Sequence, residues 1–226
     1  FFYCISAYDD LHPYICGVYI SPDETVNFKT FHEIMLSPDG YARRSIENKM
    51  ALDTRIDPAD EDPILTLNAN DIQIQGIQRI PVPPPSWLVR IGYDRTWWVT
   101  DATGVGSGSV TDQQQELIEE WRYVEDSRSS ILTSYADALP RVYGTCIRRL
   151  WNASLIAQRM LQLDGTARQG WRITLAGHHW AFDIGSIIAV DGYSRYDISG
   201  KQFAVFGYDL GMTEGEPTTD LLVWGG

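Results

Sequence analysis

The chain has 226 residues, 44% of them hydrophobic and 12% aromatic, so it can bury a sizeable core and is not expected to be disordered. Its net charge of -12, from 30 acidic and 18 basic side chains, excludes a basic surface that neutralises phosphates, so specific nucleic-acid binding is not expected. The three cysteines form no CxxC pair, which argues against a disulfide scaffold or a structural zinc site and favours buried free thiols in a reducing cytoplasm.

The start of the chain, Phe1-Phe2-Tyr3-Cys4, lacks an initiator methionine, a basic flank and a long apolar run. These residues are therefore not expected to be a signal peptide. No apolar run approaches transmembrane length, so no membrane segment is expected. Because the chain begins inside a predicted strand, we interpret it as part of a longer polypeptide.

Residues 1–82 are predicted to form an irregular, β-rich segment. A strand is expected over 14–20 and a short helix over 43–52. Apolar residues alternate with period two over 64–67 and 71–77, which is typical of half-buried strands.

An acidic loop lies between two prolines in this segment. Its carboxylates could hold calcium, but they lack the order of an EF-hand, and a solvated loop is the favoured interpretation. They are Asp57, Asp60, Glu61 and Asp62.

Three consecutive prolines, Pro83 to Pro85, cannot donate to a strand ladder and hold an extended path. A stiff connector is favoured over a peptide ligand for another module. We therefore place a domain boundary here, dividing the chain into 1–82 and 83–226.

The second part begins with a predicted strand over 87–93, continued or paired by 96–100, and a flexible glycine-rich loop over 104–109. Thr111 and Gln114 resemble a capping box, which predicts a helix near 112–122. Apolar residues at helical spacing predict a helix over 150–164, with Gly165 as its stop. Strands and turns are expected from there to the end.

No catalytic, cofactor or metal site is predicted. His178 and His179 are adjacent in an expected strand, so their rings point to opposite faces and are interpreted as structural. The glycines of 104–108 lack the Lys-Ser/Thr of a phosphate loop, and no Gly-x-Ser-x-Gly elbow occurs. The glycosylation sequon at Asn152 falls inside the predicted helix and is discarded.

Trp97 and Trp98 could form a sugar-stacking platform. Adjacent rings in a strand face opposite sides, however, so core and interface roles are favoured. Twelve Tyr and eight Trp in this chain suit broad sheet faces and protein interfaces.

The order of the elements after residue 83 resembles the C-terminal part of the hub-type family in tail proteins of long-tailed bacteriophages. The resemblance rests on a Pro-rich approach to a strand that ends in Tyr93-Asp94-Arg95-Thr96-Trp97, and on a helix over 153–163 followed by a strand over 171–175. An apolar run at 184–188, an Arg-containing turn at Arg195 and two strands follow, Gly200-Lys201-Gln202-Phe203-Ala204-Val205 and Leu222-Val223-Trp224-Gly225. Ser186 stands where the family usually has Asp, so no role for a buried carboxylate carries over to this turn.

The resemblance implies a β-rich α+β fold, with β-barrel or sandwich-like modules and one or two packed helices. It also implies a structural virion protein of the phage tail, assembled in the host cytoplasm, in a tail tip, hub or baseplate that serves host attachment. Such proteins self-associate as trimers or rings and join tube, tip and fibre proteins. No active site carries over, so the protein is not expected to be an enzyme.

Two further expectations accompany this interpretation. The acidic balance suits a channel wall that DNA passes without binding. The residues expected to pack the fold are Ala157, Met160, Leu161, Phe203, Val205 and Trp224.

An alternative from another class is a carbohydrate-binding or glycan-cleaving module built on Trp97 or Trp98 with an acidic pair. Such a module is expected to be a soluble monomer with glycan affinity, whereas a hub protein is expected to self-associate.

Overall fold

The computed structural model describes residues 39–44, 50–97, 99, 118–179, 182–193, 196–213 and 215–226. Several expected features lie outside these residues: the strand over 14–20, the glycine-rich loop, the capping box, Trp98 and Arg195. The described residues form two compact units. Unit 1 comprises the described residues within 39–41 and 85–166, and unit 2 those within 42–84 and 167–226.

Unit 2 is built on a six-stranded sheet in the order β3-β9-β10-β11-β8-β4. Every neighbouring pair in it is antiparallel except β3 and β9, which are parallel. The strands are β3 (Leu65–Leu67), β4 (Ile72–Ile80), β8 (Gln169–Ala176), β9 (Ile187–Val190), β10 (Lys201–Thr213) and β11 (Glu216–Gly225).

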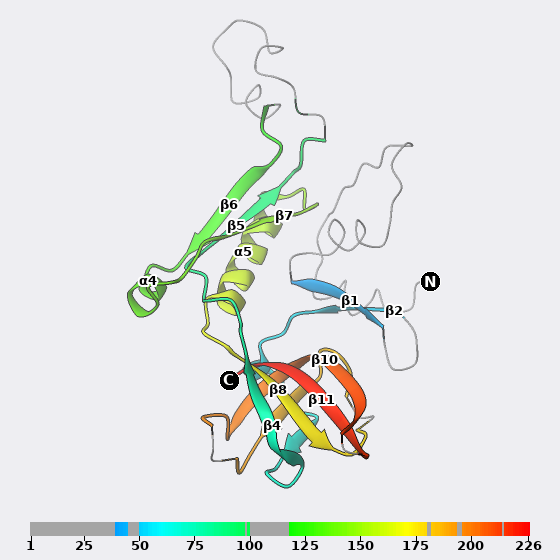
Figure 1. Ribbon diagram of the computed structural model, residues 1–226. Coiled ribbons are helices and arrows are strands. Elements are labelled where there is room, and N and C mark those ends of the chain that lie inside the picture. Colours follow the sequence, from blue (N-terminus) through cyan, green and yellow to red (C-terminus); the bar gives the residue numbers. More distant parts are fainter. Residues whose placement is uncertain are drawn as a thin grey trace, which may run out of the picture. The chain divides into compact units, whose positions relative to one another are not determined.

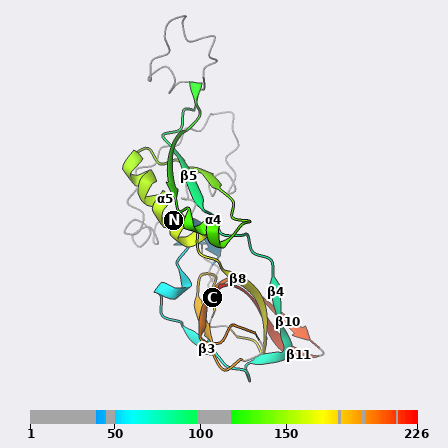
Figure 2. The same ribbon diagram turned by 90° about the vertical axis from the view of Figure 1, so that its left-hand side faces the viewer.

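The sheet curls into a barrel, as Figures 1 and 2 show. Its two edge strands, β3 and β4, are consecutive in the chain and joined only by residues 68–71. The Asp71 amide donates to the Asn68 carbonyl at 3.0 Å, and the Asn68 amide donates to Asp71 Oδ2 at 2.8 Å. This tight turn holds the edges of the sheet close to each other.

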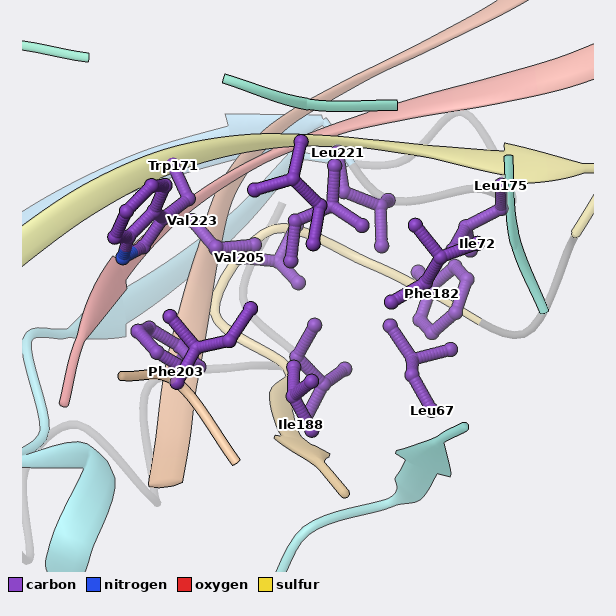
Figure 3. Close-up of a cluster of buried hydrophobic side chains, with 14 residues drawn as sticks. Leu67, Ile72, Trp171, Leu175, Phe182, Ile188, Phe203, Val205, Leu221 and Val223 are labelled. Carbon is purple, nitrogen blue, oxygen red and sulfur yellow. The ribbon is translucent and has the colours of Figure 1, made fainter. Parts of the chain in front are cut away.

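Alternate side chains of these strands fill the barrel (Figure 3). Ile173, Leu175 and Leu221 are fully buried, as are Phe203 and Ile188 on the opposite wall. Burying such a side chain contributes about 1.5–3 kcal/mol, so this cluster is the main source of stability for the unit. The alternation of apolar residues in the sequence therefore arises, as expected, from strands with one face buried.

A separate two-stranded sheet consists of β1 (Gly40–Arg44) and β2 (Met50–Thr54), and a short 3₁₀ helix, η1 (Pro58–Asp60), follows it. The helix predicted over 43–52 is therefore wrong at both of its ends, because residues 43–44 lie in β1 and residues 50–52 lie in β2. Arg43 in β1 instead binds Asp53, one position before the end of β2, with Nε and Oδ2 3.1 Å apart. Cross-strand pairing here outweighs a weak helical pattern.

Unit 1 contains a three-stranded sheet in the order β6-β5-β7, with β5 (Leu88–Tyr93) antiparallel to β6 (Arg122–Ser127) and parallel to β7 (Arg141–Gly144). A short helix, α4 (Ser130–Ser134), follows β6, and the long helix α5 (Leu150–Asp164) follows β7. Val89 and Ile91 of β5 pack with the buried side of α5 in one core cluster.

Helix α5 confirms the prediction over 150–164, and its stripe from Ala153 to Leu161 is buried as expected. Gly165 ends it, but with a φ of -80° rather than a left-handed conformation. Glycine is needed for space, because a Cβ at this position would overlap the backbone carbonyl oxygen of Leu161.

The helix predicted near 112–122 lies mostly outside the described residues. Ile118 is helical, but β6 already begins at Arg122, so the expected end of that helix is wrong. The strand expected over 96–100 is likewise not formed at Thr96, Trp97 or Val99.

The two units differ from the expected division into 1–82 and 83–226. Strand β4 lies before the prolines and pairs with β8, placing Arg79 opposite Trp171 and Ile80 opposite Gly170. The consecutive prolines mark the point near residue 84 where the chain passes from one unit to the other. Strand pairing between distant segments, however, decides which segments share a core. The fold class itself, β-rich α+β, is confirmed.

Candidate interaction surface

The face of the unit 1 sheet opposite α5 carries a tryptophan that lies on two glycines. Gly92 of β5 and Gly144 of β7 are opposite each other in register. A Cβ at Gly92 would lie 3.1 Å from the Trp121 ring, and one at Gly144 would lie 2.9 Å from it. The two glycines therefore leave a flat surface, the seat on which the Trp121 indole packs, and any larger residue at either position would crowd the ring.

Arg95 holds two tryptophans together beside this seat. Its guanidinium carbon lies 4.4 Å from the centroid of Trp97 and 5.1 Å from that of Trp121. Glu120 Oε1 accepts from Arg95 Nε at 2.9 Å and lies 2.6 Å from Nη2. The Thr96 amide also donates to the Glu120 carbonyl at 2.9 Å, so the two segments are joined through both side chains and backbone.

Arg90 repeats the arrangement on the adjacent strands. Its guanidinium lies 5.6 Å from the Tyr123 ring centroid and pairs with Glu125. Cation–π contacts of this kind contribute about 0.5–1 kcal/mol at exposed sites. We call the set Arg90, Arg95, Trp97, Trp121 and Tyr123 the aromatic–arginine face.

This face is open to solvent in part, with Trp97 37% and Tyr123 46% exposed. Val142 of β7 is 58% exposed. Trp, Tyr and Arg are the residues that most often carry binding energy between proteins. The arrangement can therefore bind a protein partner. One side of the Trp97 ring already contacts Arg95, which leaves less of it for a sugar.

A buried ionic cluster lies at the end of α5. The Asp164 side chain is almost fully buried, accepts from the Tyr143 hydroxyl at 2.8 Å and pairs with Arg141 Nη1 at 2.9 Å. Burial raises the pKa of Tyr143, and the negative charge of Asp164 raises it further. Burial lowers the pKa of Arg141, but its hydrogen bond to Tyr143 and the charge of Asp164 raise it overall.

In unit 2, Trp224 lies on the outside of the barrel rather than in its core. The guanidinium carbons of Arg55 and Arg168 lie 5.5 Å and 5.8 Å from its ring centroid. Arg168 also pairs with Asp57, which caps η1. Trp224, one of the residues expected to pack the fold, therefore packs on the outer side of the barrel wall, because it alternates with the inward-pointing Val223. The other five expected packing residues are buried.

The acidic loop is only partly solvated. Asp60, Glu61 and Asp62 are exposed as expected, whereas Asp57 is half-buried against Arg168. At the turn where the resemblance led us to expect Asp, the hydroxyl of Ser186 accepts from the Asp183 amide at 3.0 Å. Asp183 itself pairs with Arg43, so a carboxylate is present three residues earlier in the sequence.

The two histidines follow β8 rather than lying within a strand. His178 Nε2 lies 3.0 Å from the Gly211 carbonyl, and His179 Nε2 lies 2.9 Å from the Ala176 carbonyl. Each ring thus contacts a different backbone carbonyl. Among the described residues, no three His, Cys, Asp or Glu side chains are grouped so that they could hold a metal ion.

Cys146 is a buried free cysteine, while Cys4 and Cys16 lie outside the described residues. Within the part of the chain that the structure describes, no helix is long and apolar enough to cross a membrane.

The sequence had singled out Trp97, but not Arg90, Trp121 or Tyr123. The sequence feature that could have indicated them is the occurrence of arginine and aromatic residues within β5 and β6 and in the segments next to them. It becomes recognisable only once β5 and β6 are placed side by side.

The fold of this chain is similar to that of a solved tail protein. A tail protein from Neisseria meningitidis MC58 is similar over 92% of this chain and 58% of its own, with 14% identity and a TM-score of 0.57. The resemblance stated from the sequence is therefore confirmed at the level of the fold.

Two other solved structures are similar with a TM-score of 0.45 each. The 43 kDa tail protein of prophage MuSo2 from Shewanella oneidensis has 10% identity, covering 82% of this chain and 50% of its own. A chain of the virion of a native gene transfer agent particle has 14% identity, covering 75% of this chain and 33% of its own. The chain thus spans between a third and three fifths of the three proteins. No family model and no curated protein matches it.

Proposed function

We propose that this chain is a structural component of a bacteriophage tail, at the tip or hub. In this proposal it self-associates into a trimer or ring that connects the tail tube to the tip or fibres, and it has no catalytic role. The observation that carries the proposal is the fold shared with the meningococcal tail protein over 92% of the chain.

The aromatic–arginine face supports the assembly role. It combines partly exposed rings with arginines whose charges are balanced by Glu120 and Glu125. A contact surface of this composition gains binding energy without leaving an unpaired charge in the interface. Its partner in this proposal is a neighbouring tail protein or another copy of the chain.

The acidic charge supports a second element of the proposal, a wall of the DNA channel. With a net charge of -12, the chain repels phosphate and releases no counterions on contact with DNA. Asp and Glu are then expected on the surface that lines the channel in the assembled ring.

The first test is the mass of the purified chain in solution, measured by light scattering at several concentrations. A discrete trimer or a larger ring is expected. A Tyr123→Ser variant should weaken the assembly, whereas Leu139→Ser, which changes a more exposed side chain outside the face, should not. A monomer at every concentration would contradict self-association of the chain.

A further inference from the structure

Strand β6 is an edge of the unit 1 sheet (Figure 1), and no strand pairs with its outer side among the described residues. The Arg128 amide donates to the Trp87 carbonyl at 2.8 Å, next to the first β5–β6 pair. This bond makes Arg128 and Trp87 a hydrogen-bonded pair. Because residue pairs in an antiparallel ladder alternate between hydrogen-bonded and non-hydrogen-bonded, the backbone groups of the even-numbered residues of β6 are hydrogen-bonded to β5. The backbone groups of Tyr123, Glu125 and Ser127 therefore point outward.

The outward groups restrict how a second β6 could pair antiparallel with the first. Bonded pairs across such a contact must join odd-numbered residues, so the two-fold axis falls on a residue of β6. Centring on Glu125 or Asp126 would place identical carboxylates opposite each other, which is unfavourable. Centring on Tyr123 leaves the second half of the strand unpaired.

Centring on Val124 is the register in which opposite charges within β6 meet. Arg122 of each copy then lies opposite Asp126 of the other, and Val124 lies opposite Val124. Centring on Ser127 would place Asp126 opposite Arg128 but leave the first half of the strand unpaired, and centring on Arg122 would place two arginines opposite each other. Charges on an edge strand normally prevent indiscriminate pairing. In β6, however, Arg122 and Asp126 attract each other across the register centred on Val124.

We infer that β6 is an interface for a second copy of this chain, with the two strands antiparallel and centred on Val124. The two sheets join into one six-stranded sheet through the backbone of Tyr123 and Glu125. The charge complementarity of Arg122 and Asp126 selects a second copy over an unrelated strand.

Both charged residues are partly exposed. Asp126 is half-buried and accepts from the Ser127 amide at 3.0 Å, with no cation beside it in the described part of the chain. Arg122 already lies 3.2 Å from Asp94, but a guanidinium has five N–H donors and can bind a second carboxylate.

This inference goes beyond the proposed ring, because a two-fold contact joins a surface to itself and closes at two copies. Combined with a trimer of the purified chain in solution it would give six copies. Its loss would return such an assembly to three, so the two contacts can be tested separately.

The test is reversal of charge at the two positions. Asp126→Arg and Arg122→Asp each place like charges opposite one another twice, and each is expected to lower the association constant for pairing about tenfold or more. The double variant restores the opposite charges and should recover to within about threefold of the original. Asp126→Arg leaves the Arg122–Asp94 pair intact, so it reports on pairing even if Arg122→Asp disturbs folding.

The matched control is Asp137→Arg, which makes the same change at an exposed residue after α4. Association is followed by sedimentation, with hydrogen exchange of the Tyr123 and Glu125 amides expected to slow as concentration rises. Masses unaffected by Asp126→Arg, or exchange independent of concentration, would overturn the β6 pairing. A trimer that persists unchanged through these substitutions would overturn it while leaving the ring standing.

Discussion

At the residue scale, the buried carboxylate of Asp164 shows how polar groups enter the core of unit 1. Removing an ion from water is costly, and the cost is offset only where partners replace the lost hydrogen bonds. Tyr143 and Arg141 supply those partners from β7. The cluster therefore fixes the end of α5 against one strand of the sheet.

We expect Tyr143→Phe to lower the free energy of unfolding by about 1–2 kcal/mol at neutral pH, because Asp164 loses a charge-assisted hydrogen bond. Chemical denaturation measures the change. Tyr123→Phe is the control, since that hydroxyl is on an exposed side chain, and it should cost less than about 0.5 kcal/mol. Equal losses in both variants would contradict the role of the cluster.

The raised pKa of Tyr143 adds a prediction for alkaline pH. The unfolded tyrosine ionises near its ordinary pKa of about 10, before the folded one does. Stability from this group is complete below that pH and is lost as pH rises through the higher folded pKa. The difference between the original chain and Tyr143→Phe, measured by denaturation across this range, should therefore narrow above about pH 10.

At the element scale, the unit 1 sheet is organised by what its two faces contact. On one face the side chains of β5 pack against α5, and on the other Gly92 and Gly144 leave room for Trp121. A larger residue at either glycine would lift the indole away from the sheet. The aromatic–arginine face depends on that seat.

We expect Gly144→Ala to lower the free energy of unfolding by about 1–3 kcal/mol and to shift the tryptophan fluorescence, because its Cβ would lie 2.9 Å from the Trp121 ring. Gly211→Ala is the matched control in another strand, since its Cβ would be 3.6 Å from the nearest side-chain atom, an ordinary contact. Unchanged fluorescence in Gly144→Ala would mean that Trp121 does not rest on this glycine.

At the scale of the whole molecule, two units each have a separate hydrophobic cluster. The core cluster of unit 2 combines residues from two separate stretches, 67–77 and 171–223, whereas the core cluster of unit 1 comes from the single stretch 89–163. Net charge acts at this scale too, because it sums over the whole chain.

We expect the full chain to show no measurable affinity for duplex DNA even at low ionic strength, where attraction to phosphate is strongest. Fluorescence anisotropy with a labelled duplex measures this, with a basic protein of similar size as the positive control. Salt-sensitive binding would mean that a local basic surface outweighs the charge of -12, and it would count against the proposed channel wall.

The sequence by itself determined the elements whose signals are local. Helix α5 and strands β5, β8, β10 and β11 lie where the local sequence pattern predicts them. The order of these elements was enough to indicate a fold similar to that of a tail protein.

Only the tertiary structure decided what depends on contacts between distant residues. The pairing of β4 with β8, the outward position of Trp224, and the seat of Trp121 on Gly92 and Gly144 join segments far apart in the chain. Such contacts are selected by the packing of whole strands and rings, and a local pattern of apolar residues carries no information on which strand becomes the neighbour.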